Sequence, residues 1–231
     1  MFKRLLQVGI LGVVSLFSNF AFADNSGIVD VNAEAKQLSA KAPNLAPKAI
    51  KLGLEAYNKA HQEGYDSRQL LTIVDYSKPS TETRFWVFDL KNNSVIYQTL
   101  VAHGQNSGDN YTTSFSNDPR SLKSSLGLYV TEQPYEGHNG YSLRLQGLDK
   151  GFNDMAKARD IVVHGGAYVS QAFADAHGRL GRSWGCFALN PTIAHSVINT
   201  IKDGTLIFAY YPDHKYLAHS DWIPHSSGFW L

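Results

Sequence analysis

The chain holds one cysteine, Cys186, in the stretch Gly181–Phe187 (GRSWGCF). Earlier in the chain the apolar run Ile161–Val163 ends in His164, which is followed by two glycines. A thiol attacks as its thiolate, and a nearby imidazole can take the thiol proton and later pass it to a departing amine. The neighbouring glycines leave room for a substrate and can present backbone N–H groups to an oxyanion. These residue types predict acyl transfer through a thiolate–imidazolium pair.

Two other interpretations stay open on these residues alone. Cys186 could be a buried small apolar residue and His164 a hydrogen-bonded core histidine, because cysteine is among the most buried residue types. His103 and His177 also precede glycine and compete for the role of base. The polar, glycine-rich flanks of Cys186 favour a loop, and His164 alone directly ends an apolar strand. We therefore prefer the Cys186–His164 pair.

The N-terminus has the features of an export signal over residues 1–23. Lys3 and Arg4 precede a mostly apolar run, Leu5–Phe17, and an Ala-Phe-Ala cleavage motif stands before Asp24. The run is shorter than the ~20 residues that cross a membrane, so we expect cleavage, periplasmic export and no membrane span afterwards. An uncleaved N-terminal anchor remains the alternative. No cysteine directly follows the cleavage site, so a lipoprotein is not expected, and the odd cysteine has no partner within the chain.

Composition narrows the class of protein. Lys and Arg number 21 against 20 Asp and Glu, without a basic run, so nucleic acid is not an expected partner. A hydrophobic fraction of 43% allows a sizeable core. Twelve Tyr, twelve Phe and four Trp fit a strand-rich fold with an aromatic-lined groove, although plain core packing is the simpler use of aromatic residues. The length suits one domain with an extension.

The two ends of the mature chain differ from its middle. We expect residues 24–65 to form a helical N-terminal extension, with a helix from Pro47 to about Gln62. This extension is predicted to cap the domain at residues 66–212 and to carry no chemistry. The C-terminal tail, residues 213–231, is expected to pack on the domain, with a partner-binding role as the alternative.

The middle of the chain alternates short β-branched or aromatic runs with turns. The predicted strands are Leu70–Tyr76, Arg84–Leu90, Ser94–Ala102, Gly127–Thr131, Ser142–Leu148, Asp160–Val163 and Thr205–Tyr211. One late helix is predicted over Pro191–Lys202. This order predicts a mainly β domain, an antiparallel sandwich or open barrel, with the helical cap at its N-terminus. The long irregular stretch Gly104–Ser125 is typical of a binding loop.

The pair of elements around the histidine and the cysteine resembles the signature of the L,D-transpeptidase catalytic-domain family, the YkuD-like murein cross-linking enzymes. That signature is a His-Gly on a strand, then a loop, then Ser or Thr, any residue, Gly and Cys; His164-Gly165 and Ser183–Cys186 match it. Gly127–Tyr129 is similar to the family's upstream strand. The resemblance covers about Leu70 to Tyr211 and implies the family's β fold.

The resemblance also implies a role for each matching residue. Cys186 would be the nucleophile and His164 the general base, with the backbone carbonyl of Gly165 orienting the imidazole. Ser183 would shape the loop, and the backbone amides of Gly185 and Cys186 would bind the oxyanion. No cofactor or metal is implied.

Two positions depart from the family pattern. Trp184 stands where many members have histidine, and Ala188 where many have arginine or asparagine. Substrate recognition by the latter position therefore does not carry over. Arg182 could supply a cation instead, although a purely structural arginine is the alternative.

The chemistry implied by the resemblance starts with the tetrapeptide stem of peptidoglycan. The thiolate would attack the carbonyl at the L-centre of diaminopimelate, expel D-Ala and leave a thioester. An amine of a neighbouring stem would then form a 3–3 cross-link. Water as acceptor would give an L,D-carboxypeptidase, and cleavage of an existing cross-link an endopeptidase. Carbapenems are the expected covalent inhibitors.

The residues that line the substrate groove do not follow from the shared motif, and we expect them on the loops of this chain. The candidate groove residues are His103, Ser116, Asn117, Tyr141, Arg144, Tyr168, Arg182 and Trp184. His138 is expected to be a plain loop residue.

Two other classes of protein are alternatives to this function. A zinc peptidase would need a His-x-His or His-x-x-Glu-His pair, and none of the nine histidines is spaced that way. A non-catalytic peptidoglycan-binding protein remains open because of Trp184 and Ala188.

Overall fold

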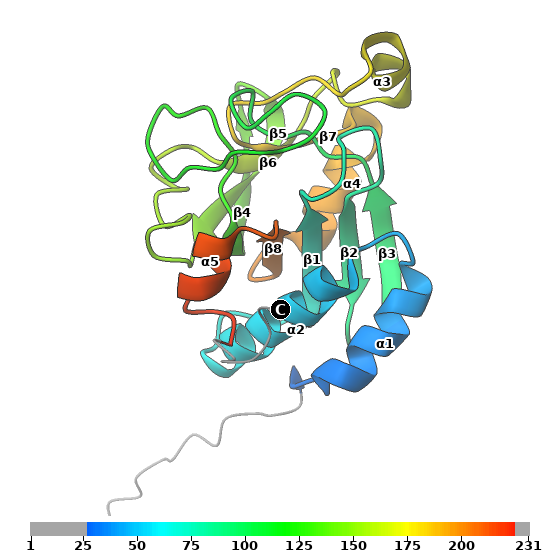
Figure 1. The fold of residues 1–231 in the computed structure, drawn as a ribbon, viewed down its shortest axis with the longest axis vertical. Helices are drawn as coiled ribbons and strands as arrows, with labels where there is room; N and C mark the ends of the chain where they lie inside the picture. Colours follow the sequence, from blue (N-terminus) through cyan, green and yellow to red (C-terminus); the bar gives the residue numbers. More distant parts are fainter. Residues whose placement is uncertain (1–26, 225–231) are drawn as a thin grey trace, which may run out of the picture.

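The computed structural model describes residues 27–224, and the predicted signal segment lies outside the described residues. They form one eight-stranded sheet in the order β3-β2-β1-β8-β4-β5-β6-β7 (Figure 1). The strands are β1 (Leu70–Asp75), β2 (Phe85–Asp89), β3 (Ser94–Thr99), β4 (Gly127–Gly137), β5 (Gly140–Gly147), β6 (Val162–Gly165), β7 (Phe187–Leu189) and β8 (Leu206–Tyr210). Neighbouring strands are antiparallel except for the parallel pairs β1–β8 and β6–β7.

The sheet is nearly closed, because the chain that leaves its first edge strand meets its last. Beyond β3, the backbone N–H of Ala102 donates to the carbonyl of Ala188 in β7 at 2.9 Å. The prediction of a mainly β, open-barrel fold is confirmed. Strand β4 runs past the predicted end at Thr131, with a register shift between Thr131 and Pro134. A proline lacks the N–H for a regular ladder, and a bulge lets the strand continue past it.

Five helices accompany the sheet in the described residues. The predicted late helix is α4 (Pro191–Ile201), which packs on β4, β5 and β6. The prediction of one late helix is incomplete, since α3 (Gln171–His177) and α5 (His214–His219) also form. Both have too few residues for a helical period to stand out in the sequence.

The N-terminal segment forms α1 (Val31–Lys41) and α2 (Pro47–Gln62), with Pro47 at the first helical position. Ile50, Leu54 and Tyr57 of α2 are fully buried in the same core as β1 and β8. Figure 1 shows α1 and α2 at the end of the molecule opposite α3. The N-terminal extension thus packs on the sheet at the end of the molecule opposite α3.

The described part of the tail also lies on the domain. Tyr216 and Leu217 of α5 are buried, and the Trp222 indole donates to the Leu148 carbonyl at 2.8 Å. Phe229 and Trp230 lie outside the described residues. Between residues 27 and 224 no helix combines the length and hydrophobicity that crossing a bilayer requires.

Candidate active site

Strands β6 and β7 bring the histidine and the cysteine to one face of the sheet. They run parallel, with His164 paired with Ala188. Cys186 directly precedes β7, so this pairing brings it to the start of β6, near the strand that carries His164. Both residues line a cavity of about 450 Å³. Its lining is His138, Asn139, Arg159, Asp160, His164, Tyr168, Arg182, Ser183, Trp184 and Cys186.

The imidazole of His164 is held in one tautomer. Its Nδ1 lies 2.8 Å from the carbonyl oxygen of Gly165. A carbonyl only accepts, so in the neutral ring Nδ1 carries the proton and Nε2 keeps its lone pair. Burial lowers the pKa of His164, against the opposing effect of the Gly165 carbonyl. The ring is therefore neutral at neutral pH, with its Nε2 able to accept a proton.

The thiol of Cys186 is nearly buried, at 9% exposure, yet it borders the cavity. Its Sγ donates to the backbone carbonyl of Asp160 at 3.5 Å. Burial raises the pKa of the Cys186 thiol, while the Val162 N–H and the Arg159 guanidinium act to lower it. The expected resting thiolate–imidazolium pair is therefore not favoured. Both groups are desolvated, and desolvation disfavours each charged form.

The Ser183 hydroxyl shapes the turn that presents the thiol. It donates to the Cys186 carbonyl at 2.8 Å and accepts from the Gly185 N–H at 3.1 Å. The Gly185 amide is therefore already used inside the loop. This contradicts the expectation that it faces an oxyanion, because one N–H cannot serve both acceptors well.

Gly185→Ala is expected to lower the free energy of unfolding by about 1–3 kcal/mol and to slow labelling of the thiol. Gly185 has φ 120°, and a Cβ there would lie 2.6 Å from the Lys123 carbonyl oxygen. Thermal unfolding and the rate of thiol alkylation check this. Gly178→Ala is the matched control, since Gly178 has φ 69° but no atom within 4 Å of an added Cβ. Equal effects of the two substitutions would contradict a role for the close approach of Gly185 to the Lys123 carbonyl.

Three predicted groove residues line the cavity with the thiol. Trp184 is 71% exposed and also borders an adjoining cavity of about 310 Å³. Tyr168 packs where Gly166 and Gly181 have no side chains, since a Cβ on either would lie within 2.8 Å of its atoms. Burial raises the pKa of Tyr168 to about 12, so this wall stays neutral. Arg182 is the third.

Ala188 explains one departure from the family pattern. It is fully buried in a small cluster with Ala102, Val169, Ala174 and Leu180. The contact with Ala102 closes the sheet, so an arginine or asparagine at this position would have no room. Recognition of a substrate by residue 188 is excluded by this packing.

His103 does not line the cavity, contrary to the prediction. It is 1% exposed, and its Nδ1 accepts from the Arg84 guanidinium at 2.7 Å. Burial and the Arg84 charge lower the pKa of His103 to about 3. His103 is a neutral buried acceptor for a buried cation, and the competing base His177 lies on α3 with its ring stacked on Phe173.

Four other predicted groove residues also lie elsewhere. The Tyr141 hydroxyl donates to Asn199 of α4 at 2.8 Å, because strand alternation turns it to the face opposite His164. Arg144 shares the face of His164, but its guanidinium stacks on the Tyr135 ring at 4.0 Å. Ser116 and Asn117 line a separate cavity of about 390 Å³. The sequence pattern did not reveal these orientations.

Four further residues line the cavity although the sequence did not predict them there: His138, Asn139, Arg159 and Asp160. Arg159 and Asp160 could have been found from their position directly before the strand that ends in His164. That position is informative only once β7 is known, because the parallel pairing of β7 places Cys186 beside the start of β6. His138 and Asn139 form the β4–β5 turn, which no local pattern connects to the thiol.

Comparison with known proteins agrees with this geometry. The family model for the L,D-transpeptidase catalytic domain (YkuD_2) matches residues 41–210. This match covers most of the chain and includes both His164 and Cys186, and the chain therefore belongs to the L,D-transpeptidase catalytic-domain family. None of the curated proteins matches the chain.

The solved structures to which this chain is similar are distant in sequence. An L,D-transpeptidase from Mycobacterium smegmatis is 14% identical, with 62% of this chain and 59% of that chain covered and a TM-score of 0.38. L,D-transpeptidase 1 from Mycobacterium tuberculosis is 15% identical, with 62% of each chain covered and a TM-score of 0.34. The cell shape determining protein Pgp2 from Campylobacter jejuni is 13% identical, with 64% and 49% covered and a TM-score of 0.42. The chain thus spans less than two thirds of these relatives.

Proposed function

We propose that this chain is a periplasmic cysteine acyltransferase that acts on peptidoglycan stem peptides and forms 3–3 cross-links through a thioester. One observation carries the proposal: Cys186 and His164 line one cavity, and the Gly165 carbonyl holds the imidazole with Nε2 as its free base. Membership of the family supports the same chemistry. The export signal predicted at residues 1–23 supports the periplasmic location.

In the first half-reaction His164 Nε2 takes the Cys186 proton as sulfur attacks the carbonyl of diaminopimelate. A carbon–sulfur bond forms, and the carbonyl electrons move to oxygen. We assign the Cys186 backbone N–H to this oxyanion, because the Gly185 N–H is held by Ser183. As the oxyanion collapses, the carbon–nitrogen bond breaks and imidazolium returns the proton to the amine of departing D-Ala.

In the second half-reaction the neutral imidazole takes a proton from the acceptor amine of a neighbouring stem. The amine nitrogen attacks the thioester carbonyl, the carbon–sulfur bond breaks, and the thiolate recovers the proton from imidazolium. Neutral resting groups suit both halves, since each cycle begins and ends with a thiol and a free imidazole. No step requires a cofactor.

Water as the acceptor would make the same site an L,D-carboxypeptidase or endopeptidase. The 450 Å³ cavity adjoins one of about 310 Å³, and the two share Arg159, Asp160 and Trp184 in their walls. This adjoining space favours a second peptide as the acceptor. A non-catalytic peptidoglycan-binding protein is the remaining alternative, and it predicts binding without turnover.

The mature protein, incubated with a diaminopimelate tetrapeptide, is expected to give the cross-linked dimer with loss of one D-Ala. Mass spectrometry separates this product from the tripeptide that hydrolysis would give. Tripeptide alone would establish the carboxypeptidase. Unchanged substrate with folded protein would contradict both enzymes and favour the binding protein.

A further inference from the structure

Two arginines border the cavity that holds the thiol, and they differ in what their N–H groups bind. Both Nη groups of Arg159 are used within the protein. They donate to four oxygens of the loop on one side of the cavity, on Ser116, Ser121, Lys123 and Ser125. Arg159 therefore positions that loop and adds charge, with no Nη donor left for a substrate.

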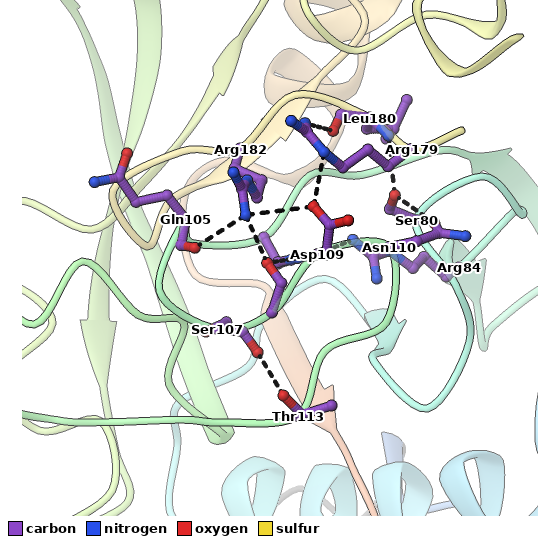
Figure 2. A network of polar contacts seen from close by, with 12 residues as sticks. Ser80, Arg84, Gln105, Ser107, Asp109, Asn110, Thr113, Arg179, Leu180 and Arg182 are labelled. Atoms are coloured by element: carbon purple, nitrogen blue, oxygen red, sulfur yellow. Dashed lines mark hydrogen bonds and ion pairs between the residues drawn. The ribbon is translucent and has the colours of Figure 1, made fainter. Parts of the chain in front are cut away.

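Arg182 is held from one side only (Figure 2). Its Nη1 donates to the carbonyl of Gly108 at 3.0 Å and to that of Gln105 at 3.4 Å. It also lies 3.5 Å from an Asp109 carboxylate oxygen, which Arg179 Nε binds at 2.8 Å. Within residues 27–224 no hydrogen bond occupies Arg182 Nε or Nη2. One edge of the guanidinium is anchored to the loop, and its other donors remain available.

The charge at this point of the wall is positive. Asp109 is shared by two arginines, is mostly exposed, and bonds Arg179 more closely than Arg182. A shared and hydrated carboxylate neutralises only part of the Arg182 charge. Arg182 also precedes Ser183, whose hydroxyl fixes the turn to Cys186. Arg182 and Cys186 therefore belong to the same short turn, and both line the cavity.

We propose that Arg182 binds the terminal carboxylate of the donor peptide and so selects stems with a free C-terminus. This inference rests on the proposed function. In a tetrapeptide the terminal carboxylate belongs to the residue that follows the scissile carbonyl. One residue of chain spans about 4 Å, so this carboxylate stays close to the carbonyl that the thiol attacks. A planar guanidinium with free adjacent donors matches a carboxylate in geometry as well as in charge.

The test measures binding rather than turnover, on protein carrying Cys186→Ala. The probes are the diaminopimelate tetrapeptide acid and the same peptide with its C-terminal D-Ala amidated, compared by titration calorimetry. The acid is expected to bind about 10- to 100-fold more tightly, as for hydrogen bonds between charged groups. Adding Arg182→Gln is expected to remove this preference, and Arg182→Lys to restore part of it through its charge.

Arg179→Gln is the matched control, since Arg179 binds the same Asp109 but does not line the cavity. It is expected to keep the preference for the acid. Equal binding of acid and amide, no binding of either, a preference that survives Arg182→Gln, or equal loss in Arg179→Gln would each overturn the proposal. A preference present here without thioester formation by the wild-type protein would keep this inference and refute the acyltransferase.

Discussion

Cys186→Ala is expected to abolish covalent labelling of the protein by a carbapenem. The strained β-lactam carbonyl is an acyl donor, and opening its ring by the Cys186 sulfur would leave a stable thioester of defined mass. Removing a nucleophile costs at least about 10⁴-fold in such chemistry. Intact-mass spectrometry after incubation with imipenem measures the outcome. Cys186 is the only cysteine of the chain, so no other thiol contributes a signal.

The unmodified wild-type protein is the reference for this experiment, and thermal unfolding of both proteins shows that they are folded. A wild-type protein that folds but forms no adduct would contradict the nucleophile. It would favour a protein that binds peptidoglycan without reacting. An adduct that persists in Cys186→Ala would place the chemistry on another residue.

His164→Ala is expected to slow acylation by about 10²- to 10⁴-fold at neutral pH, the usual contribution of a general base. The shape of the pH profile should change as well. Because burial lowers the pKa of His164, the wild-type rate should rise on an acid limb with a midpoint below 6.5 and then level off. Burial raises the pKa of Cys186 above 9.0, so without the base the rate should climb tenfold per pH unit through neutrality. Stopped-flow acylation from pH 5 to 10 distinguishes the two profiles.

His177→Ala is the control for this prediction. His177 lies on α3, its ring stacked on Phe173 at 4.1 Å, and does not border the thiol cavity. Its removal should leave both the rate and the pH profile unchanged. The reverse result, with His177→Ala inactive and His164→Ala active, would reassign the base.

Much of the fold was predictable because its signals are local. Apolar and aromatic runs marked seven of the eight strands, and Pro47 and Pro191 marked the starts of α2 and α4. Strand β7 was missed because Phe187–Leu189 is only three residues long and follows a glycine-rich turn. Short strands gain their stability from the partners on either side, and no local propensity reports those partners.

The residues that line the cavity were harder to predict than the strands. Five candidate residues were reasonable by residue type, yet none lines the cavity that holds the thiol: His103, Ser116, Asn117, Tyr141 and Arg144. The face that a strand residue occupies changes with a shift of one position. The orientation of a loop side chain also depends on its buried hydrogen-bond partner, as the contact of His103 with Arg84 illustrates.

By itself the sequence determined the fold class and predicted the Cys186–His164 pair, because a lone cysteine in a Ser-x-Gly-Cys turn and a histidine ending a strand are properties of the chain. Only the tertiary structure decided the protonation of that pair and the lining of its cavity. Charge state depends on burial, and burial depends on what packs around a group, which here includes the Asp160 carbonyl and the Arg159 loop contacts. Residues far apart in the chain supply that environment, so no short stretch of sequence contains it.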